Sequence, residues 1–138
     1  MRSTAAPSSP AAIRVAVVED DHAFRSAFAR ALATAPGMTL VWVAGTRAEA
    51  LALLGGPDAD VLLVDLGLPD GSGIDVIRAA QRAWPACAAM VTTAFADETH
   101  VLASIEAGAS GYLLKDAPPE AFVREIRTLH CGGSPISP

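Results

Sequence analysis

The segment of residues 61–71, VLLVDLGLPDG, constrains the fold of this chain more than any other part of it. Four apolar, strand-forming residues end on Asp65, and a turn rich in proline and glycine follows at once. A continuous apolar run of this length is typical of a strand that is buried on both faces, as in a parallel sheet covered by helices. Because functional groups in such sheets lie just beyond the carboxyl ends of the strands, the pattern predicts Asp65 at the rim of the sheet.

The remaining sequence alternates between strand-like and helix-like segments. Apolar faces at helical spacing, with glycine and proline at the breaks, set the boundaries. Five strands and five helices in strict alternation predict an α/β fold, a flavodoxin-like doubly wound (βα)5 with a parallel sheet in the order 2-1-3-4-5. This order places a crevice between the first and third strands. We expect strands over residues 13–18, 38–44, 60–66, 86–93 and 110–114, and helices over residues 22–35, 46–54, 72–84, 97–107 and from 118 onward.

Charged residues gather at the predicted strand ends. Glu19 and Asp20 follow the first strand, Asp65 ends the third, and Lys115 follows the fifth. An ionised carboxylate can attack phosphorus and form an aspartyl-phosphate. Carboxylate oxygens are also the ligands that a hard dication such as Mg²⁺ prefers. Three acids and one lysine at three strand ends therefore suggest a metal-assisted phosphoryl site.

Composition narrows the alternatives. The 138 residues suit one domain, and a net charge of −5 without a Lys/Arg cluster argues against direct binding to nucleic acid. No apolar run approaches the ~20 residues of a membrane span, so we expect no membrane partner. Residues 1–12, rich in Ser, Pro and Ala, are expected to form a flexible tail. Cys87 and Cys131 match no metal-ligand pattern and are expected to be free thiols.

Several motifs occur in an order that carries a family resemblance. They are Val17-Val18-Glu19-Asp20, DLGLPDG from Asp65, Val-Thr-Thr93, and GASGYLLKD over residues 108–116. Together they resemble the receiver domain of bacterial two-component response regulators, from about residue 13 to about residue 133. Read with GGSPISP at residues 132–138, the last motif is most similar to the NarL/FixJ (LuxR-like) type. The resemblance implies a receiver domain at residues 13–133 and the start of a linker at residues 134–138, with the DNA-binding domain absent from this chain.

The resemblance assigns Asp65 as the phosphoacceptor. It also implies a Mg²⁺ ion held by Glu19, Asp20, Asp65 and the backbone carbonyl of Gly67. The acidic run Glu19-Asp20-Asp21 requires a choice, and the family spacing selects the first two. Asp20 is then the direct ligand, and Glu19 acts through water. Asp21 is expected to cap the following helix.

The resemblance also assigns the residues that respond to phosphorylation. Thr93 and Lys115 are expected to engage phosphoryl oxygens, and the family spacing favours Thr93 over its neighbour Thr92. Tyr112 is expected to be the aromatic whose ring moves inward when Thr93 engages the phosphoryl group. The same tyrosine would equally suit a static, half-buried position in the core. Phe95, two residues beyond Thr93, is expected to flank the path of hydrolytic water without orienting it.

The implied function is a signalling switch and not an enzyme, with at most Mg²⁺-dependent phosphorylation and dephosphorylation of itself. A histidine kinase is the expected phosphodonor, and the receiver helices are candidates for a homodimer contact. The expected output is transcription in the cytoplasm, through a helix-turn-helix domain of the full-length protein.

Two other function classes fit the sequence less well. A haloacid-dehalogenase-type phosphatase typically needs a second acid two residues after its nucleophile, where Gly67 stands. A flavin-binding electron carrier on the same fold needs a phosphate loop after the first strand. The acidic run at residues 19–21 would repel a phosphate there.

Overall fold

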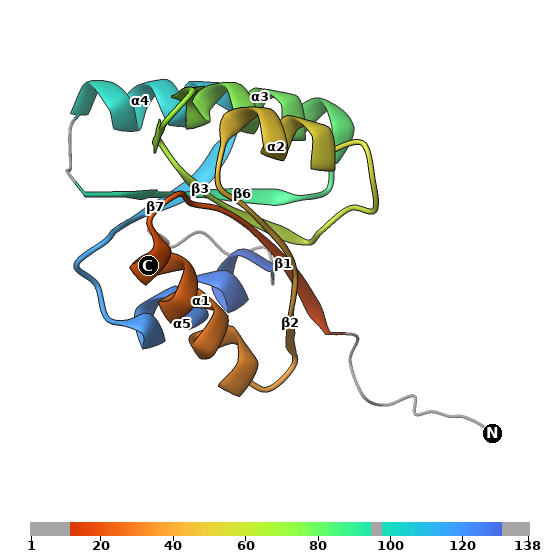
Figure 1. Cartoon of the computed structure of the whole chain (residues 1–138), viewed down its shortest axis with the longest axis vertical. Coiled ribbons are helices and arrows are strands. Elements are labelled where there is room, and N and C mark those ends of the chain that lie inside the picture. The colour runs from red at the N-terminus through yellow and green to blue at the C-terminus, as the bar shows by residue number, and fades with distance from the viewer. Residues whose placement is uncertain (1–11, 95–97, 131–138) are drawn as a thin grey trace.

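The apolar runs of the sequence form a five-stranded parallel sheet in the computed structural model, which describes residues 12–94 and 98–130. The strand order is β2-β1-β3-β6-β7, so the predicted order 2-1-3-4-5 is confirmed (Figure 1). The strands of this sheet are β1 (Ile13–Val18), β2 (Met38–Ala44), β3 (Val61–Asp65), β6 (Ala88–Thr93) and β7 (Ala109–Leu114). The helices are α1 (His22–Thr34), α2 (Arg47–Leu53), α3 (Gly73–Ala83), α4 (Glu98–Ala107) and α5 (Pro119–His130).

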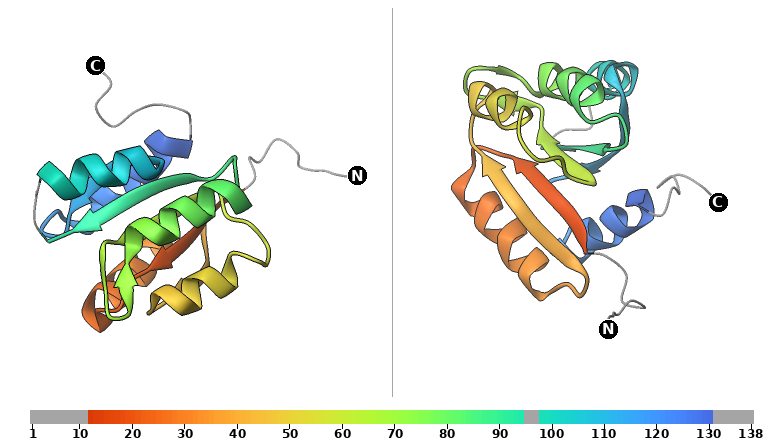
Figure 2. Two further views of the ribbon diagram at one scale, coloured as in Figure 1. Left: turned by 90° about the horizontal axis from the view of Figure 1, so that it is seen from above. Right: turned by 90° about the vertical axis from the view of Figure 1, so that its right-hand side faces the viewer.

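Helices cover both faces of the sheet. In Figure 1, α1 and α5 lie on one side of it and α2, α3 and α4 on the other, and the two views of Figure 2 agree. Alternate residues of β3 therefore enter two separate cores. Leu63 packs with Phe28 and Ile126 on the α1/α5 side, whereas Val64 packs with Val76 on the other. All of β3 is buried, as its continuous apolar run predicts.

Two helix starts are capped by the side chain of the preceding residue. The Asp21 side chain accepts a hydrogen bond from the N–H of Ala23 at 2.9 Å, so Asp21 caps α1 as predicted. The Thr46 hydroxyl accepts the N–H of Glu49 at 3.0 Å and caps α2. The Glu49 side chain returns to the residue before this cap, since its Oε1 accepts the N–H of Gly45 at 2.8 Å, one position earlier than in a standard capping box.

Some predicted boundaries are wrong by one or two residues. β6 begins at Ala88 and not at residue 86, because the N–H of Cys87 donates to the Trp84 carbonyl in a turn (2.9 Å). A second, two-stranded antiparallel sheet follows Asp65, formed by β4 (Gly67–Leu68) and β5 (Gly71–Ser72), and the sequence did not predict it. Its second strand begins with Gly71 at φ 155°, a backbone conformation that favours glycine.

Several expectations fall outside the described residues. They concern the tail up to residue 11, Phe95, Cys131 and the linker at residues 134–138. Cys87 is buried and carries no disulfide, as expected of a free thiol. In the part of the chain that the structure describes, the search for a helix long and apolar enough to cross a membrane finds none.

Candidate functional site

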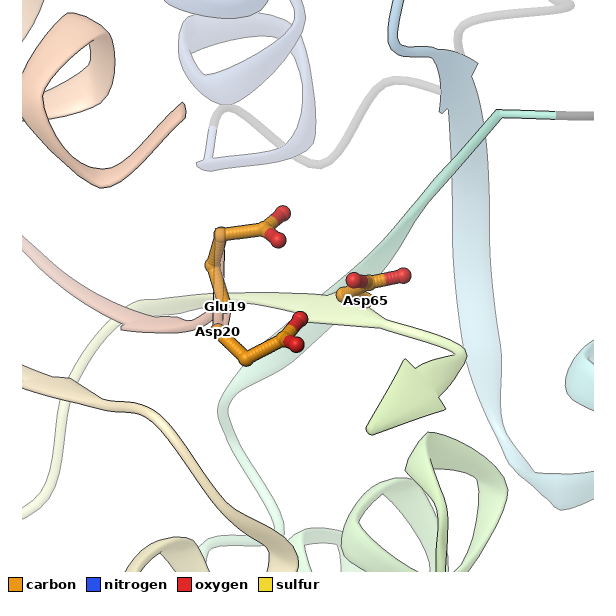
Figure 3. A group of neighbouring side chains, drawn as sticks. All are labelled: Glu19, Asp20 and Asp65. Atoms are coloured by element: carbon orange, nitrogen blue, oxygen red, sulfur yellow. The ribbon is translucent and has the colours of Figure 1, made fainter. Parts of the chain in front are cut away.

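Three carboxylates meet at the carboxyl ends of β1 and β3. These strands are neighbours in the sheet, with Val18 paired to Val64, so the residues that follow them emerge side by side. Figure 3 shows the side chains of Glu19 and Asp20 extending from the end of β1 toward Asp65. One carboxylate oxygen from each of the three lies within 4.8 Å of the others. The crevice between the first and third strands is therefore acidic, as the strand order predicts.

Lys115 joins this cluster from the end of β7, the strand at one edge of the sheet. It follows β7 and reaches across β6, so that its Nζ donates to Asp65 Oδ2 at 3.0 Å. The same Nζ lies 2.9 Å from each Glu19 oxygen and donates a hydrogen bond to Oε2. It also lies 4.7 Å from the centroid of the Phe24 ring, a contact that the sequence did not predict. The structure thus brings together the lysine and the two buried acids predicted for the site.

Glu19 is the most deeply buried member of the cluster, with no exposed surface. Burial raises the pKa of its carboxyl to about 7, and the neighbouring charge of Asp65 acts in the same direction. Lys115 and the N–H of Asp21 oppose this rise. Burial also acts to lower the pKa of Lys115, but hydrogen bonds to Glu19 and Asp65 outweigh it and the pKa is raised. The ammonium therefore stays charged between the two acids.

The acidic cluster fits a hard dication on three observations. Within the described residues, Glu19 Oε1 is buried and makes no hydrogen bond, although it faces the ammonium at 2.9 Å. The cluster holds three carboxylates, and the ammonium of Lys115 contacts only those of Glu19 and Asp65, so the carboxylate of Asp20 is left for a cation. All the ligand atoms on offer are oxygens, and Asp20 is exposed, so waters can complete a coordination shell. These residues are suited to Mg²⁺ by charge, by donor type and by access.

The hairpin β4–β5 returns the chain to Asp65. The N–H of Gly67 donates to Asp65 Oδ1 at 3.1 Å, so each carboxylate oxygen of Asp65 has its own donor. Gly67 itself is exposed at the mouth of the cluster. Gly73, the first residue of α3, packs directly beneath Asp65. The hairpin thus places the N–H of Gly67 against the carboxylate of Asp65.

The two threonines that end β6 occupy different environments. Thr92 is paired with Asp65 in the sheet and is almost fully buried. Thr93 lies one residue further toward the rim, is half-buried, and accepts the N–H of Lys115 through its carbonyl at 2.8 Å. Tyr112 lies on β7 with 41% of its surface exposed, so its ring is not enclosed in the core. It borders a groove of about 570 Å³ together with Ile105 and Leu114.

Sequence reasoning missed one set of contacts near the site. Asp70 was expected only as a turn residue, yet its carboxylate binds the first two N–H groups of α2, from Arg47 and Ala48. The Arg47 side chain in turn donates to Asp75 of α3 at 2.9 Å. Local composition predicts a turn at Asp70, but nothing in it indicates a partner 23 residues away.

The sequence of this chain matches a known protein family and resembles several curated proteins. Residues 15–127 match the family described as the response regulator receiver domain. The chain is 36% identical to the nitrate/nitrite response regulator protein NarP of Escherichia coli over 114 residues, which are 83% of this chain and 53% of NarP. The chain spans a little more than half the length of the curated relatives that it matches.

Solved structures agree with this match. The signal receiver domain of the putative response regulator NarL from Mycobacterium tuberculosis superimposes with a TM-score of 0.83 at 28% identity, covering 89% of this chain and 99% of that one. A response regulator from Burkholderia pseudomallei, solved with a phosphorylated aspartic acid, a calcium ion and citrate, superimposes with a TM-score of 0.76 at 27% identity. That match covers 86% of this chain and 69% of the other.

Proposed function

Because this chain belongs to the response regulator receiver domain family, we propose that Asp65 accepts a phosphoryl group from a partner histidine kinase in a Mg²⁺-dependent reaction. The observation that carries the proposal is the position of Lys115. Its ammonium bridges Glu19 and Asp65 at the rim of the sheet, where the charge of an incoming phosphoryl group needs a partner. The receiver domain on this proposal extends over residues 13–133, with a linker starting at residue 134.

The transfer joins one carboxylate oxygen of Asp65 to phosphorus, while the bond from phosphorus to the donor histidine breaks. Asp65 is held for this step by two donors, Lys115 and the N–H of Gly67. Once the phosphoryl group is attached, the ammonium neutralises one of its oxygens. Asp20, Asp65 and the Gly67 carbonyl would hold Mg²⁺, with Glu19 acting through water, and the metal would supply neutralisation of the charge on the transferring group.

Thr93 and Tyr112 are the residues that report the phosphoryl group. Thr93 stands at the rim end of β6, whereas Thr92 is enclosed in the sheet, so Thr93 is the hydroxyl that an exposed phosphoryl oxygen meets first. On this proposal Thr93 shifts toward the phosphoryl group, and the ring of Tyr112, which is exposed on β7, moves inward. The phosphate adds about −1.5 to −2 charges and three acceptor oxygens, and these groups favour the conformation in which Thr93 contacts the phosphoryl group.

The surface that changes is formed by α4, β7 and α5. It exposes Leu102, Ile105 and Tyr112 around the groove described above. On our proposal this surface is where the receiver helices meet a second copy or another output partner. In the full-length protein the output is transcription through a helix-turn-helix domain in the cytoplasm, in keeping with relatives named as transcriptional regulatory proteins.

The test is intact-mass spectrometry after incubation with acetyl phosphate and MgCl2. We expect a single phosphoryl adduct on the wild type, none on Asp65→Asn, and none on the wild type when Mg²⁺ is chelated. Asp21→Asn is the matched control, because it makes the same chemical change two residues from Glu19 but keeps the cap of α1. An adduct of equal yield on Asp65→Asn would refute the assignment of the nucleophile.

A further inference from the structure

The tip of the β4–β5 hairpin is fastened to the start of α2. Asp70 stands at this tip, where its Oδ1 accepts the N–H of Arg47 at 2.6 Å and its Oδ2 accepts the N–H of Ala48 at 2.9 Å. Both N–H groups belong to the first turn of a helix, where amides have no partner within the helix. Asp70 is therefore a second cap of α2, supplied from a distant loop, in addition to the local cap of Thr46.

Arg47, the first residue of α2, also contacts the hairpin and α3 through its side chain. Its Nε donates to Asp75 Oδ2 of α3 at 2.9 Å. Its side-chain stem lies across Gly71, where an added Cβ would lie 2.5 Å from Arg47 Cδ. The hairpin is thus held between the helix that precedes it in sequence and the helix that follows it. The pKa of Asp70 lies below its ordinary value because the N–H groups of Ala48 and Arg47 donate to the charged form.

The other end of the hairpin closes on the site. The N–H of Gly67 donates to Asp65 Oδ1, and the N–H of Gly73 donates to the Leu66 carbonyl at 3.0 Å. The helix that Asp70 caps begins just after β2, whose last residue, Ala44, accepts the N–H of Glu19 at 2.8 Å. Hydrogen bonds of backbone and side-chain groups therefore connect the segments on both sides of the acidic cluster to the start of α2.

We propose that Asp70 is a positioning residue of the metal site, which holds the hairpin against α2 and so fixes the Gly67 carbonyl relative to Asp20 and Asp65. The inference rests on the proposed function, since it concerns the Mg²⁺ assigned there. Asp70 acts through the hairpin backbone and touches neither metal nor phosphoryl group. Removal of partners that orient metal ligands typically weakens metal affinity by ~10–100-fold.

Calorimetric titration with MgCl2 tests the proposal on three proteins: wild type, Asp70→Ala and Thr46→Ala. Thr46→Ala removes the hydroxyl that accepts the N–H of Glu49, so it weakens the same helix start without touching the hairpin. We expect Asp70→Ala to raise the Kd for Mg²⁺ by about tenfold or more, and Thr46→Ala to change it by less than about twofold. Asp70→Asn retains one acceptor oxygen, so its Kd for Mg²⁺ should lie between those of the wild type and Asp70→Ala. If Asp70→Ala does not fold, Asp70→Asn replaces it in the comparison.

Amide hydrogen exchange in metal-free protein gives a second readout. We expect faster exchange at Gly67 and Gly73 in Asp70→Ala but not in Thr46→Ala. An unchanged Kd in Asp70→Ala, or equal losses of affinity in both variants, would overturn the proposal. If the wild type itself bound no Mg²⁺, the proposed function would fail. If the wild type bound Mg²⁺ and Asp70→Ala bound it equally well, only this inference would fail.

Discussion

At the scale of single residues, the approach of α3 to the acidic end of β3 depends on Gly73. An added Cβ at this position would overlap the carbonyl oxygen of Asp65 and lie 2.8 Å from Val64 Cγ1. Both neighbours belong to a strand that is buried on both faces, so neither can move cheaply. The helix can begin directly beneath Asp65 only because this residue has no side chain.

Gly73→Ala should therefore destabilise the protein by about 1–3 kcal/mol, because the extra methyl group forces the β3 backbone to shift. Gly67→Ala is the matched control, since a Cβ there would meet no atom of the described residues within 4 Å. We expect its effect on stability to stay within about 0.5 kcal/mol. Urea denaturation of both variants measures the difference, and similar midpoints for the two would contradict the packing argument.

Individual site residues differ in how far the sequence predicts them. Asp65 and Lys115 follow apolar strands, and strand ends are where site residues of a parallel sheet lie, so both could be placed in advance. The complete burial of Glu19 and its ion pair with Lys115 could not be predicted from the sequence. The two residues are separated by 96 positions, and only the folded sheet shows that one lysine faces both acids.

At the scale of elements, the start of α2 has two caps of different chemistry. Thr46 supplies a neutral hydroxyl from the preceding residue, and Asp70 supplies a carboxylate from another loop. The lowered pKa of Asp70 means that the folded protein favours its ionised form. This contribution to stability is complete above the ordinary pKa of an aspartate, and it is lost as pH falls through the lower pKa of the folded state.

The difference in unfolding free energy between wild type and Asp70→Ala should accordingly be constant from about pH 7 down to about pH 5, and shrink below about pH 4. For Thr46→Ala the difference should remain near ~1 kcal/mol throughout, because a hydroxyl does not titrate. Urea denaturation at pH 7, pH 5 and pH 3.5, in chelator, supplies the comparison. A difference for Asp70→Ala that persisted undiminished at the lowest pH would argue against its capping role.

Periodicity and helix caps predicted the main elements because α1, α2, α3 and α5 each bury apolar residues against the sheet, and because β1, β3 and β6 are mostly apolar throughout. The β4–β5 hairpin was missed for a physical reason. Its strands are two residues long, too short to show an alternating pattern, and contacts with Arg47 and Ala48 hold its turn in place. Local sequence signals cannot report a partner in another element.

At the scale of the whole molecule, a metal that binds only the folded chain adds to its stability. The acids of the proposed site are brought together by the sheet and are separated in an unfolded chain, so Mg²⁺ has little to bind there. Mass action then links metal concentration to the free energy of unfolding. The size of the effect depends only on the ratio of free Mg²⁺ to its Kd.

With Mg²⁺ at ten times the Kd of the wild type, we expect the free energy of unfolding to rise by about 1.4 kcal/mol. Asp20→Asn at the same Mg²⁺ concentration should lose most of this increase, because a direct ligand loses its charge. Asp21→Asn should keep it, since its side chain caps α1. Chemical denaturation in MgCl2 is compared with denaturation in NaCl at equal ionic strength. The difference between the two measures the effect of Mg²⁺ binding without that of ionic screening. Equal gains for both variants would contradict Asp20 as the direct ligand, and a larger loss for Asp21→Asn would place the acid pair one residue away.

Lys115 lies far in sequence from both of its acidic partners. This separation affects when their contacts form during folding. The contacts of Lys115 to Asp65 and Glu19 span 50 and 96 residues, so the ammonium arrives only when β7, the last strand of the sheet, has docked. Contacts of such long range form late in folding, because loop closure must come first. A chain still emerging from the ribosome, or one that has lost β7 by partial unfolding, carries Asp65 without its cationic partner. On the proposed function, Asp65 therefore has its cationic partner for phosphoryl transfer only in a chain whose β7 has docked.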